Sequence, residues 1–381
     1  MFESRYGANQ RQAVGGDFFF DTFYNVGTAY DLSGNNTGNL PSGFVSIQAA
    51  NSGLKWETTK EINLGIDFTM LNNALVGSFD YFTRETSDIL TIPPIASAIG
   101  EGQLRTLNGA TTETRGWELS LGYSKTLDNG FSFTVATNFG AFKDEITELP
   151  AEVVSAFPGT VDNSIIGHSQ FSIFGYKTAG LFQSQADVDS SPTQVGARPG
   201  GLKFQDLSGN GSIGAEDRDF IGTTLPDLEY GIRIDMAYKN FDLSLFGSGV
   251  AGRIGQDPYI LWNNFASGRE NGGLGLLDAW TPNNTGSSIP SLSLANNDTR
   301  ISDYLFRNNS YFKLRNLQIG YSLPEELTNK LAGMSSCRIY FQGENLFWFT
   351  PSDYIGADPE RTDVNRIPVP TTLSLGLNIN F

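Results

Sequence analysis

The sequence predicts an all-β fold and, within that class, a transmembrane β-barrel of the outer-membrane type. Apolar and polar residues alternate strictly over many segments, as they do along strands with two different faces. The connections between these segments are either tight turns or long polar loops. The composition agrees, because 28 Phe, 14 Tyr and 43 Gly suit thin apolar faces and turns better than a helical core.

The first strands show the pattern clearly. In segment 62–70, Ile62, Leu64 and Ile66 share one face, and in its partner, 75–84, Phe79 and Tyr81 do so. Seven more segments follow in order: 117–124, 131–141, 227–238, 241–245, 311–322, 336–349 and 373–381. The sequence thus predicts about nine spanning strands from residue 58 onward, whereas residues 1–57 are expected to form a loop and a partial strand.

Turn lengths orient these strands. Three connections are tight, at 71–73, 128–130 and 239–240, and outer-membrane barrels place such turns on the periplasmic side and long loops outside. Strand parity then leaves residues 171–182 in a long extracellular loop. The same parity predicts a short periplasmic helix within 322–334 and a last strand that ends with a periplasmic C-terminus.

A soluble β-sandwich or propeller would also show alternation. Two features favour the barrel instead. Charged residues such as Asp80, Glu118 and Arg233 lie in mid-strand on the polar face, as a wet lumen allows. Aromatic residues lie near strand ends on the apolar face, as in the girdles of membrane barrels.

Charge and composition exclude several other classes. A formal net charge of −16 makes nucleic acid an unsuitable partner. One cysteine, Cys337, permits no internal disulfide framework, and one histidine, His168, removes most metal and Ser-His-Asp sites. The sequence contains no apolar run of about 18 residues, so no transmembrane helix is predicted. The start, MFESRYGANQRQ, does not have the pattern of a signal peptide, so none is predicted.

The chain ends on TLSLGLNINF, with alternating apolar residues and a terminal Phe381. The last strand of a barrel must pair with the first, so a chain that stops in mid-strand is compatible with closure. This ending resembles the signal that the outer-membrane barrel assembly machinery recognises.

Several longer motifs resemble the C-terminal barrel of SusC/RagA-type TonB-dependent outer-membrane transporters of the Bacteroidota. They are NLGIDFTMLNNALVGSFDYFTRETSDIL, NGATTETRGWELSLGY, GLKFQDLSGNGSIGAEDRDFIG, YFKLRNLQIGYSLPEEL, GENLFWFT and GADPE, in the order of the family. The resemblance implies import of oligosaccharides or peptides, a SusD-like lid lipoprotein, and energy from the TonB complex.

The resemblance implies a barrel of about 22 strands around a plug domain. Nine strands are fewer and odd in number, and neither a plug nor a TonB box is recognisable here. We therefore expect residues 1–381 to be the C-terminal barrel part of a longer transporter. The alternative class is a non-transporting outer-membrane barrel protein, such as an adhesin or a surface hydrolase.

One loop has the spacing of a calcium site. The segment DLSGNGSIGAED places oxygen-bearing side chains around Gly211, at the spacing of an EF-hand-type loop. The candidate ligands are Asp206, Ser208, Asn210, Ser212 (through its carbonyl) and Asp217. A Gly- and Asn-rich loop that binds no ion is the alternative, and no other cofactor is expected.

Aromatic residues in segment 252–309 are candidate contacts for a sugar substrate or for the lid protein: Tyr259, Trp262 and Trp280. They could equally pack the loop itself. The sequence does not show how far apart carboxylates such as Glu216 and Asp219 lie, and an acidic extracellular loop explains them without catalysis. We therefore expect no enzymatic activity. The glycines of GNGSIG lack the strand and helix that a dinucleotide site needs.

Overall fold

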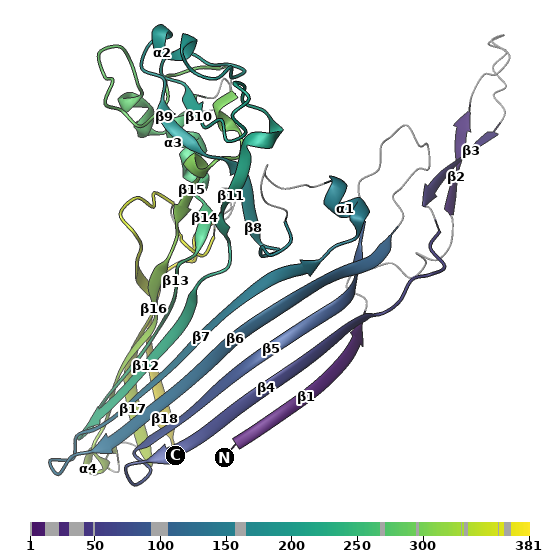
Figure 1. Cartoon of the computed structure of the whole chain (residues 1–381). Helices are drawn as coiled ribbons and strands as arrows, with labels where there is room; N and C mark the ends of the chain where they lie inside the picture. The colour runs from purple at the N-terminus through teal and green to yellow at the C-terminus, as the bar shows by residue number, and fades with distance from the viewer. Residues whose placement is uncertain are drawn as a thin grey trace.

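A computed structural model of the chain forms one ten-stranded antiparallel sheet with a folded body at one rim (Figure 1). The sheet order is β1-β4-β5-β6-β7-β12-β13-β16-β17-β18, so neighbours in sequence are mostly neighbours in space. The structure describes residues 2–11, 23–29, 42–48, 50–92, 106–156, 165–266, 271–294, 297–328, 330, 334–356, 358–361 and 367–381.

The nine segments with alternating patterns all lie in this sheet. Their strands are β4 (Glu57–Met70), β5 (Leu75–Thr91), β6 (Leu107–Thr126), β7 (Ser132–Glu148), β12 (Leu228–Tyr238), β13 (Phe241–Ala251), β16 (Tyr311–Ser322), β17 (Ser336–Phe349) and β18 (Thr372–Asn380). A tenth, β1 (Phe2–Arg11), pairs with β4 over its whole length. The first 57 residues therefore contribute a full strand to the wall where a partial one was expected.

One face of the sheet, called the outer face below, is apolar from strand to strand. The register aligns Ile66 with Phe79, Phe79 with Leu119, and so on to Phe139 and Tyr230. At the other edge, Ile339 and Phe341 lie opposite Leu377 and Leu375. Leu375 is 79% exposed, and exposed apolar side chains in a continuous row are what a lipid-facing wall requires.

The opposite, inner face is polar at the same depth. A single row of side chains crosses seven strands through paired positions: Ser124, Thr134, Asp235, Ser244, Gln318, Gln342 and Ser374. Because side chains alternate along a strand, this row follows directly from the same register that builds the outer face. The sheet thus separates an apolar environment from a wet one.

The tight turns lie together at the rim called the short-turn rim (Figure 1). Leu71, Asn72 and Asn73 adopt φ of 54°, 54° and 69°, and Lys239 adopts 54°. Asn tolerates this left-handed region well, which favours the LNN turn, whereas in the KN turn the left-handed residue is Lys239. The helix expected within 322–334 is one turn long, α4 (Glu325–Thr328), at the same rim.

The long connections at the other rim fold into a body of their own, called the loop domain (residues 165–227 and 252–309). It contains β8 (Ser172–Tyr176), β9 (Thr178–Leu181), β10 (Leu202–Phe204), β11 (Arg218–Thr223), β14 (Ile254–Gln256), β15 (Phe306–Asn308), α2 (Gln185–Asp189), α3 (Pro258–Asn264), η2 (Ala215–Asp217), η3 (Leu274–Asp278), η4 (Asn297–Thr299) and η5 (Asp303–Leu305). Residues 171–182 thus lie outside the main sheet, as predicted.

The loop domain carries a hydrophobic core, whereas both faces of the wall are largely open. The core consists of Leu181, Leu202, Phe204, Ile213, Ile260, Phe265, Trp280 and Leu305. Outside it, β2 (Phe23–Ala29) pairs with β3 (Ser42–Gln48), and α1 (Ala151–Ala156) follows β7. None of the helices in the described ranges is long and apolar enough to cross a membrane.

Candidate solute-facing surface and mouth

Charged and amide side chains on the inner face are held by one another. Arg233 donates from Nε to Asp235 at 2.7 Å, and Ser244 donates to the same carboxylate at 2.7 Å. Beside them, a hollow of about 670 Å³ is lined by Asp67, Asn138 and Arg233 among others. Fixed polar groups of both signs around a hollow can offer hydrogen bonds to a polar solute or to a protein segment.

A second polar group lies nearer the short-turn rim. Arg338 donates from Nε to Asp242 at 2.9 Å and from a terminal nitrogen to Gln318 at 2.9 Å. Gln318 in turn donates to Gln342 at 3.2 Å. These bonds link β13, β16 and β17 across the inner face, so the side chains are positioned by rigid strands and by each other.

The predicted aromatic contacts separate into two kinds. Trp280 is 6% exposed, packs within the core of the loop domain, and donates from Nε1 to Gln183 at 3.1 Å. Burial leaves almost none of its ring for a ligand, so the prediction of a contact at Trp280 is corrected to a packing role. Trp262 on α3 is 45% exposed, and Tyr259 on the same helix is partly buried.

Trp262 borders a pocket of about 440 Å³ in the loop domain. Apolar side chains of Leu261, Phe265 and Ile301 line it together with polar Gln256 and Asn271. A pocket with an aromatic wall and a few polar groups can take a small apolar or sugar-like group.

The predicted calcium loop is a compact turn around two carboxylates. Asp206 accepts backbone N–H groups of Gly209 at 2.7 Å and Gly211 at 2.8 Å. Asp217 is fully buried and accepts those of Ser208 at 2.9 Å and Gly214 at 2.7 Å. Burial raises the pKa of Asp217, but these donors outweigh burial and hold the pKa below its usual range.

The other two candidate ligands bond each other. Ser212 donates to Asn210 Oδ1 through its backbone N–H at 2.8 Å and its hydroxyl at 2.9 Å. All five candidates therefore belong to one turn, held by its own hydrogen bonds. Since a carboxylate offers about four lone-pair positions, Asp206 keeps acceptor capacity for an ion. The calcium site stays a prediction.

A buried ionic cluster joins the wall to the last loop (described residues 350–356, 358–361 and 367–371). Lys313 of β16 is fully buried; its Nζ lies 3.2 Å from Asp358 and 3.0 Å from Glu360, and 5.5 Å from the ring centre of Trp348. Arg315 adds a bond to Glu360 at 2.8 Å. The sequence predicted none of these pairs, although GADPE was recognised as a motif.

The carboxylates of the cluster are well compensated. Burial raises the pKa of Glu360, but hydrogen bonds from Arg315, Lys313 and a third donor outweigh it and lower the pKa to about 2. The third donor is the hydroxyl of Tyr311, at 2.9 Å. Asp358 also accepts the backbone N–H of Val369 at 3.1 Å. The last loop is thereby fixed against the inner face.

The same loop is tied to the loop domain. Asp257, fully buried at the start of α3, accepts the backbone N–H of Tyr259 at 3.0 Å through one oxygen. Its other oxygen accepts the N–H of Ile355, in the last loop, at 2.9 Å. One carboxylate thus caps a helix of the loop domain and holds the last loop.

The sequence profile described as "TonB dependent receptor-like, beta-barrel" matches residues 18–346. The chain belongs to the TonB-dependent receptor family. This receptor is 33% identical over 388 residues to TonB-dependent receptor P3 of Formosa agariphila, an alignment that covers 95% of this chain and 38% of that protein. It is 26% identical to TonB-dependent receptor SusC of Bacteroides thetaiotaomicron, over 99% of this chain and 37% of that protein.

Solved structures show the same fold. The structure titled as that of the RagAB peptide transporter aligns with a TM-score of 0.76 at 20% identity, over 100% of this chain and 40% of that chain. The closed-closed state of RagAB aligns with a TM-score of 0.75. The predicted transmembrane β-barrel fold and the resemblance to SusC and RagA are confirmed, and the family places this receptor in the outer membrane.

Proposed function

We propose that this receptor chain forms wall and mouth of a TonB-dependent importer of oligosaccharides or peptides. The observation that carries the proposal is the two-faced sheet, apolar outside and crossed inside by a row of polar side chains over seven strands, with a folded loop domain at one rim only. Such a wall borders a polar path through lipid, and such a mouth selects what enters. The chain spans 38% of the length of TonB-dependent receptor P3, so the plug and TonB box would come from the rest of a longer protein.

In this proposal the short-turn rim and the C-terminus are periplasmic, and the loop domain is extracellular. Short turns on one rim and long loops on the other support this orientation. A cysteine introduced at exposed Ser288 should react with a membrane-impermeant maleimide added to whole cells, whereas one at exposed Asn380 should not. The opposite labelling pattern would reverse the orientation.

The mouth would dock a SusD-like lid lipoprotein through an apolar patch formed by Trp262, Leu274, Leu277 and Ile301. Leu274 and Leu277, on η3, are 84% and 85% exposed. The backbone N–H of Gly273, just before η3, donates to the carbonyl of Trp262 at 2.8 Å, which holds η3 beside α3. Exposed leucines on an ordered surface are typical of protein interfaces.

Uptake tests the proposal. Cells that depend on the full-length receptor should accumulate a fluorescent maltooligosaccharide or oligopeptide, and loss of the receptor should abolish accumulation. The pair Leu274→Asp and Leu277→Asp should reduce both uptake and co-purification of the lid lipoprotein. Leu71→Asp, at an exposed position on the opposite rim, is the matched control. Surface hydrolysis or cell adhesion without uptake would favour a non-transporting barrel protein.

The length of the parent protein can be measured directly. An antibody against residues 252–309 should detect a band near or above 100 kDa in outer membranes, because about 22 strands and a plug require that size. A band near 41.5 kDa would contradict the fragment part of the proposal.

A further inference from the structure

The apolar band of the outer face has a defined upper edge on β5 and β6. On β12 the outward residues run from Leu228 to Tyr238, across a strand of 11 residues whose length corresponds to a rise of roughly 25 Å when the strand is tilted. That height matches the hydrocarbon layer. At the long-loop side the band ends in the cross-strand pair of Tyr81 and Trp117, a position typical of an interfacial aromatic girdle.

Above this pair the same face becomes charged in two successive rows. The first row places Arg115 of β6 directly opposite Lys143 of β7. The second places Glu113 opposite Glu85 and Glu145. With about 3.3 Å per residue along tilted strands, the rows lie roughly 5 and 10 Å beyond the girdle, at the depth of lipid headgroups.

Carboxylates of the wall neutralise Arg115 more fully than they neutralise Lys143. Arg115 donates to Glu113 on its own strand at 2.6 and 2.9 Å and keeps a side chain that is 59% exposed. Lys143 has no carboxylate within ion-pair distance among the residues that the structure describes. Like charges directly opposite each other destabilise a sheet unless a counter-ion joins them.

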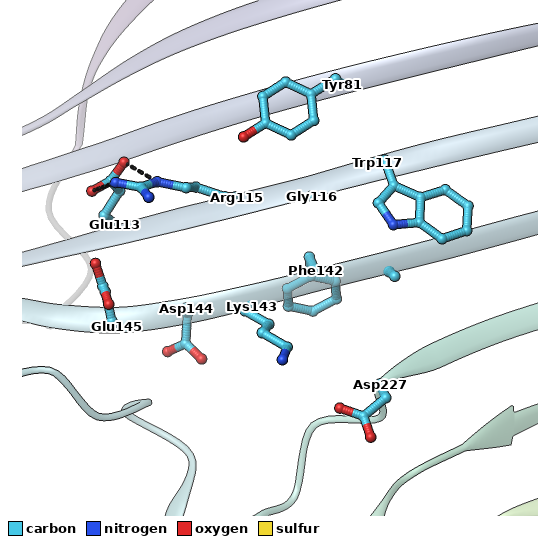
Figure 2. Close-up of a pocket in the computed structure, with 11 residues that line it drawn as sticks. Tyr81, Glu113, Arg115, Gly116, Trp117, Phe142, Lys143, Asp144, Glu145 and Asp227 are labelled. Atoms are coloured by element: carbon cyan, nitrogen blue, oxygen red, sulfur yellow. Dashed lines mark hydrogen bonds and ion pairs between the residues drawn. The ribbon is translucent and has the colours of Figure 1, made fainter.

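Figure 2 shows Arg115, Lys143, Glu113 and Glu145 close together. They line a hollow of about 380 Å³. The aromatic rings of Tyr81 and Trp117 and the two cations line it together. Asp144 also borders the hollow, but it is buried and accepts the backbone N–H of Gln170 at 3.0 Å. Asp227, the residue just before β12, borders the hollow as well. The arrangement combines an apolar floor, a cationic row, an outer acidic row and this carboxylate at the side.

We propose that this part of the outer face binds the phosphate headgroup of an outer-leaflet lipid. Arg115 and Lys143 bind the phosphate oxygens, and Tyr81 and Trp117 contact the lipid below the phosphate. The acidic row lies beyond the phosphate, where amines or divalent cations that neutralise headgroups collect. A lipid is the occupant because the wall immediately below the site faces lipid, which delivers a phosphate at this depth.

The test uses the full-length receptor in detergent and three probes: dioctanoyl phosphatidate, dioctanoylglycerol and inorganic phosphate. Binding is measured by native mass spectrometry and by titration calorimetry. We expect phosphatidate to bind best, and Lys143→Gln and Arg115→Gln each to weaken it roughly tenfold. Lys143→Arg should restore binding, and Lys125→Gln, on β6 with Arg115 but near the short-turn rim, should leave it unchanged.

Each other result counts against the proposal. Equal binding of phosphatidate and dioctanoylglycerol would show that the phosphate is not recognised. Equal binding of inorganic phosphate and phosphatidate would show an anion site that does not select a lipid. Unchanged binding in Lys143→Gln, with a heat-modifiable band proving a folded barrel, would place the lipid elsewhere. None of these results depends on transport.

Discussion

Nζ of Lys313 lies 3.2 Å from Oδ2 of Asp358, and neither side chain is exposed to solvent. The pair joins a strand of the wall to a loop 45 residues further along the chain. Charges removed from water must be compensated by partners, and here each ion has more than one. The pair therefore fixes where the last loop lies rather than adding a separate large stabilisation.

Removing the cation should release the last loop. Lys313→Met leaves Asp358 buried without its charge partner, which costs about 3–5 kcal/mol. Protease cleavage within residues 351–361, measured on the full-length receptor in outer membranes, should accelerate at least a hundredfold. Lys60→Met is the control, because its pair with Glu85 at 3.8 Å is exposed and contributes about 1 kcal/mol or less.

Acid should release the same loop. The pKa of Glu360 falls from 4.5 to about 2 on folding, so its stabilising contribution is complete above pH 4.5 and is lost as the pH falls towards 2. Pepsin cleavage of the last loop should therefore rise steeply between pH 4.5 and 2. In Glu360→Gln the rise should be much shallower, after correction for the pH profile of pepsin on an unfolded peptide.

One glycine of the wall should not tolerate a methyl group. A Cβ on Gly249 of β13 would overlap the carbonyl oxygen of Tyr311 on β16 and approach the hydroxyl of Tyr230 at 2.8 Å. Gly249→Ala must shift the pairing of β13 with β16, at a cost of about 1–3 kcal/mol. The fraction of receptor that is heat-modifiable on unboiled gels should fall.

The matched control for that change is Gly140→Ala in β7, where a Cβ meets nothing within 4 Å. Its assembled fraction should equal that of the unaltered receptor. Equal assembly of both variants would show that the close approach of β13 and β16 is not needed.

The loop around Asp206 and Asp217 should bind calcium. Full-length receptor dialysed against 45Ca should retain about one ion more than the variant Asp206→Asn, which loses a ligand charge. Asp217→Asn should also lose the ion, because it removes the second ligand charge of the predicted site. Ser190→Ala, in the same domain, should keep it. Equal retention by all four proteins would show that the loop needs no ion.

The strands could be predicted because alternation is a local property of the chain. Strand β6 alternates from Trp117 onward, and its pairing with β7 follows from the tight turn at 128–130. Strand β1 was underestimated because FESRYGANQR has few apolar residues to alternate. Its place in the sheet depends on pairing with β4, and pairing is a property of two segments.

The candidate site could be predicted only where its residues are close in sequence. The turn from Asp206 to Asp217 was found by spacing, since the side-chain bonds of its candidate ligands lie within that segment. Lys313 and Asp358 could not be paired, because nothing local marks a lysine in a strand as buried. Trp280 shows a second limit. The sequence alone does not show whether an aromatic residue in a polar loop segment packs in a core or contacts a ligand, because its neighbours in space are not known.

Asp257 and Lys313 hold the last loop at two points, one to the loop domain and one to the wall. The two attachments act in series, so a displacement of α3 reaches β16 through Ile355 and Asp358. The last loop therefore transmits force between α3 and β16, and this connection is only as strong as the weaker of its two attachments. The weaker attachment is the one to the loop domain, which consists of the hydrogen bond at Ile355 and one from Arg253 to the carbonyl oxygen of Pro359, because the ionic cluster at the other end has more bonds.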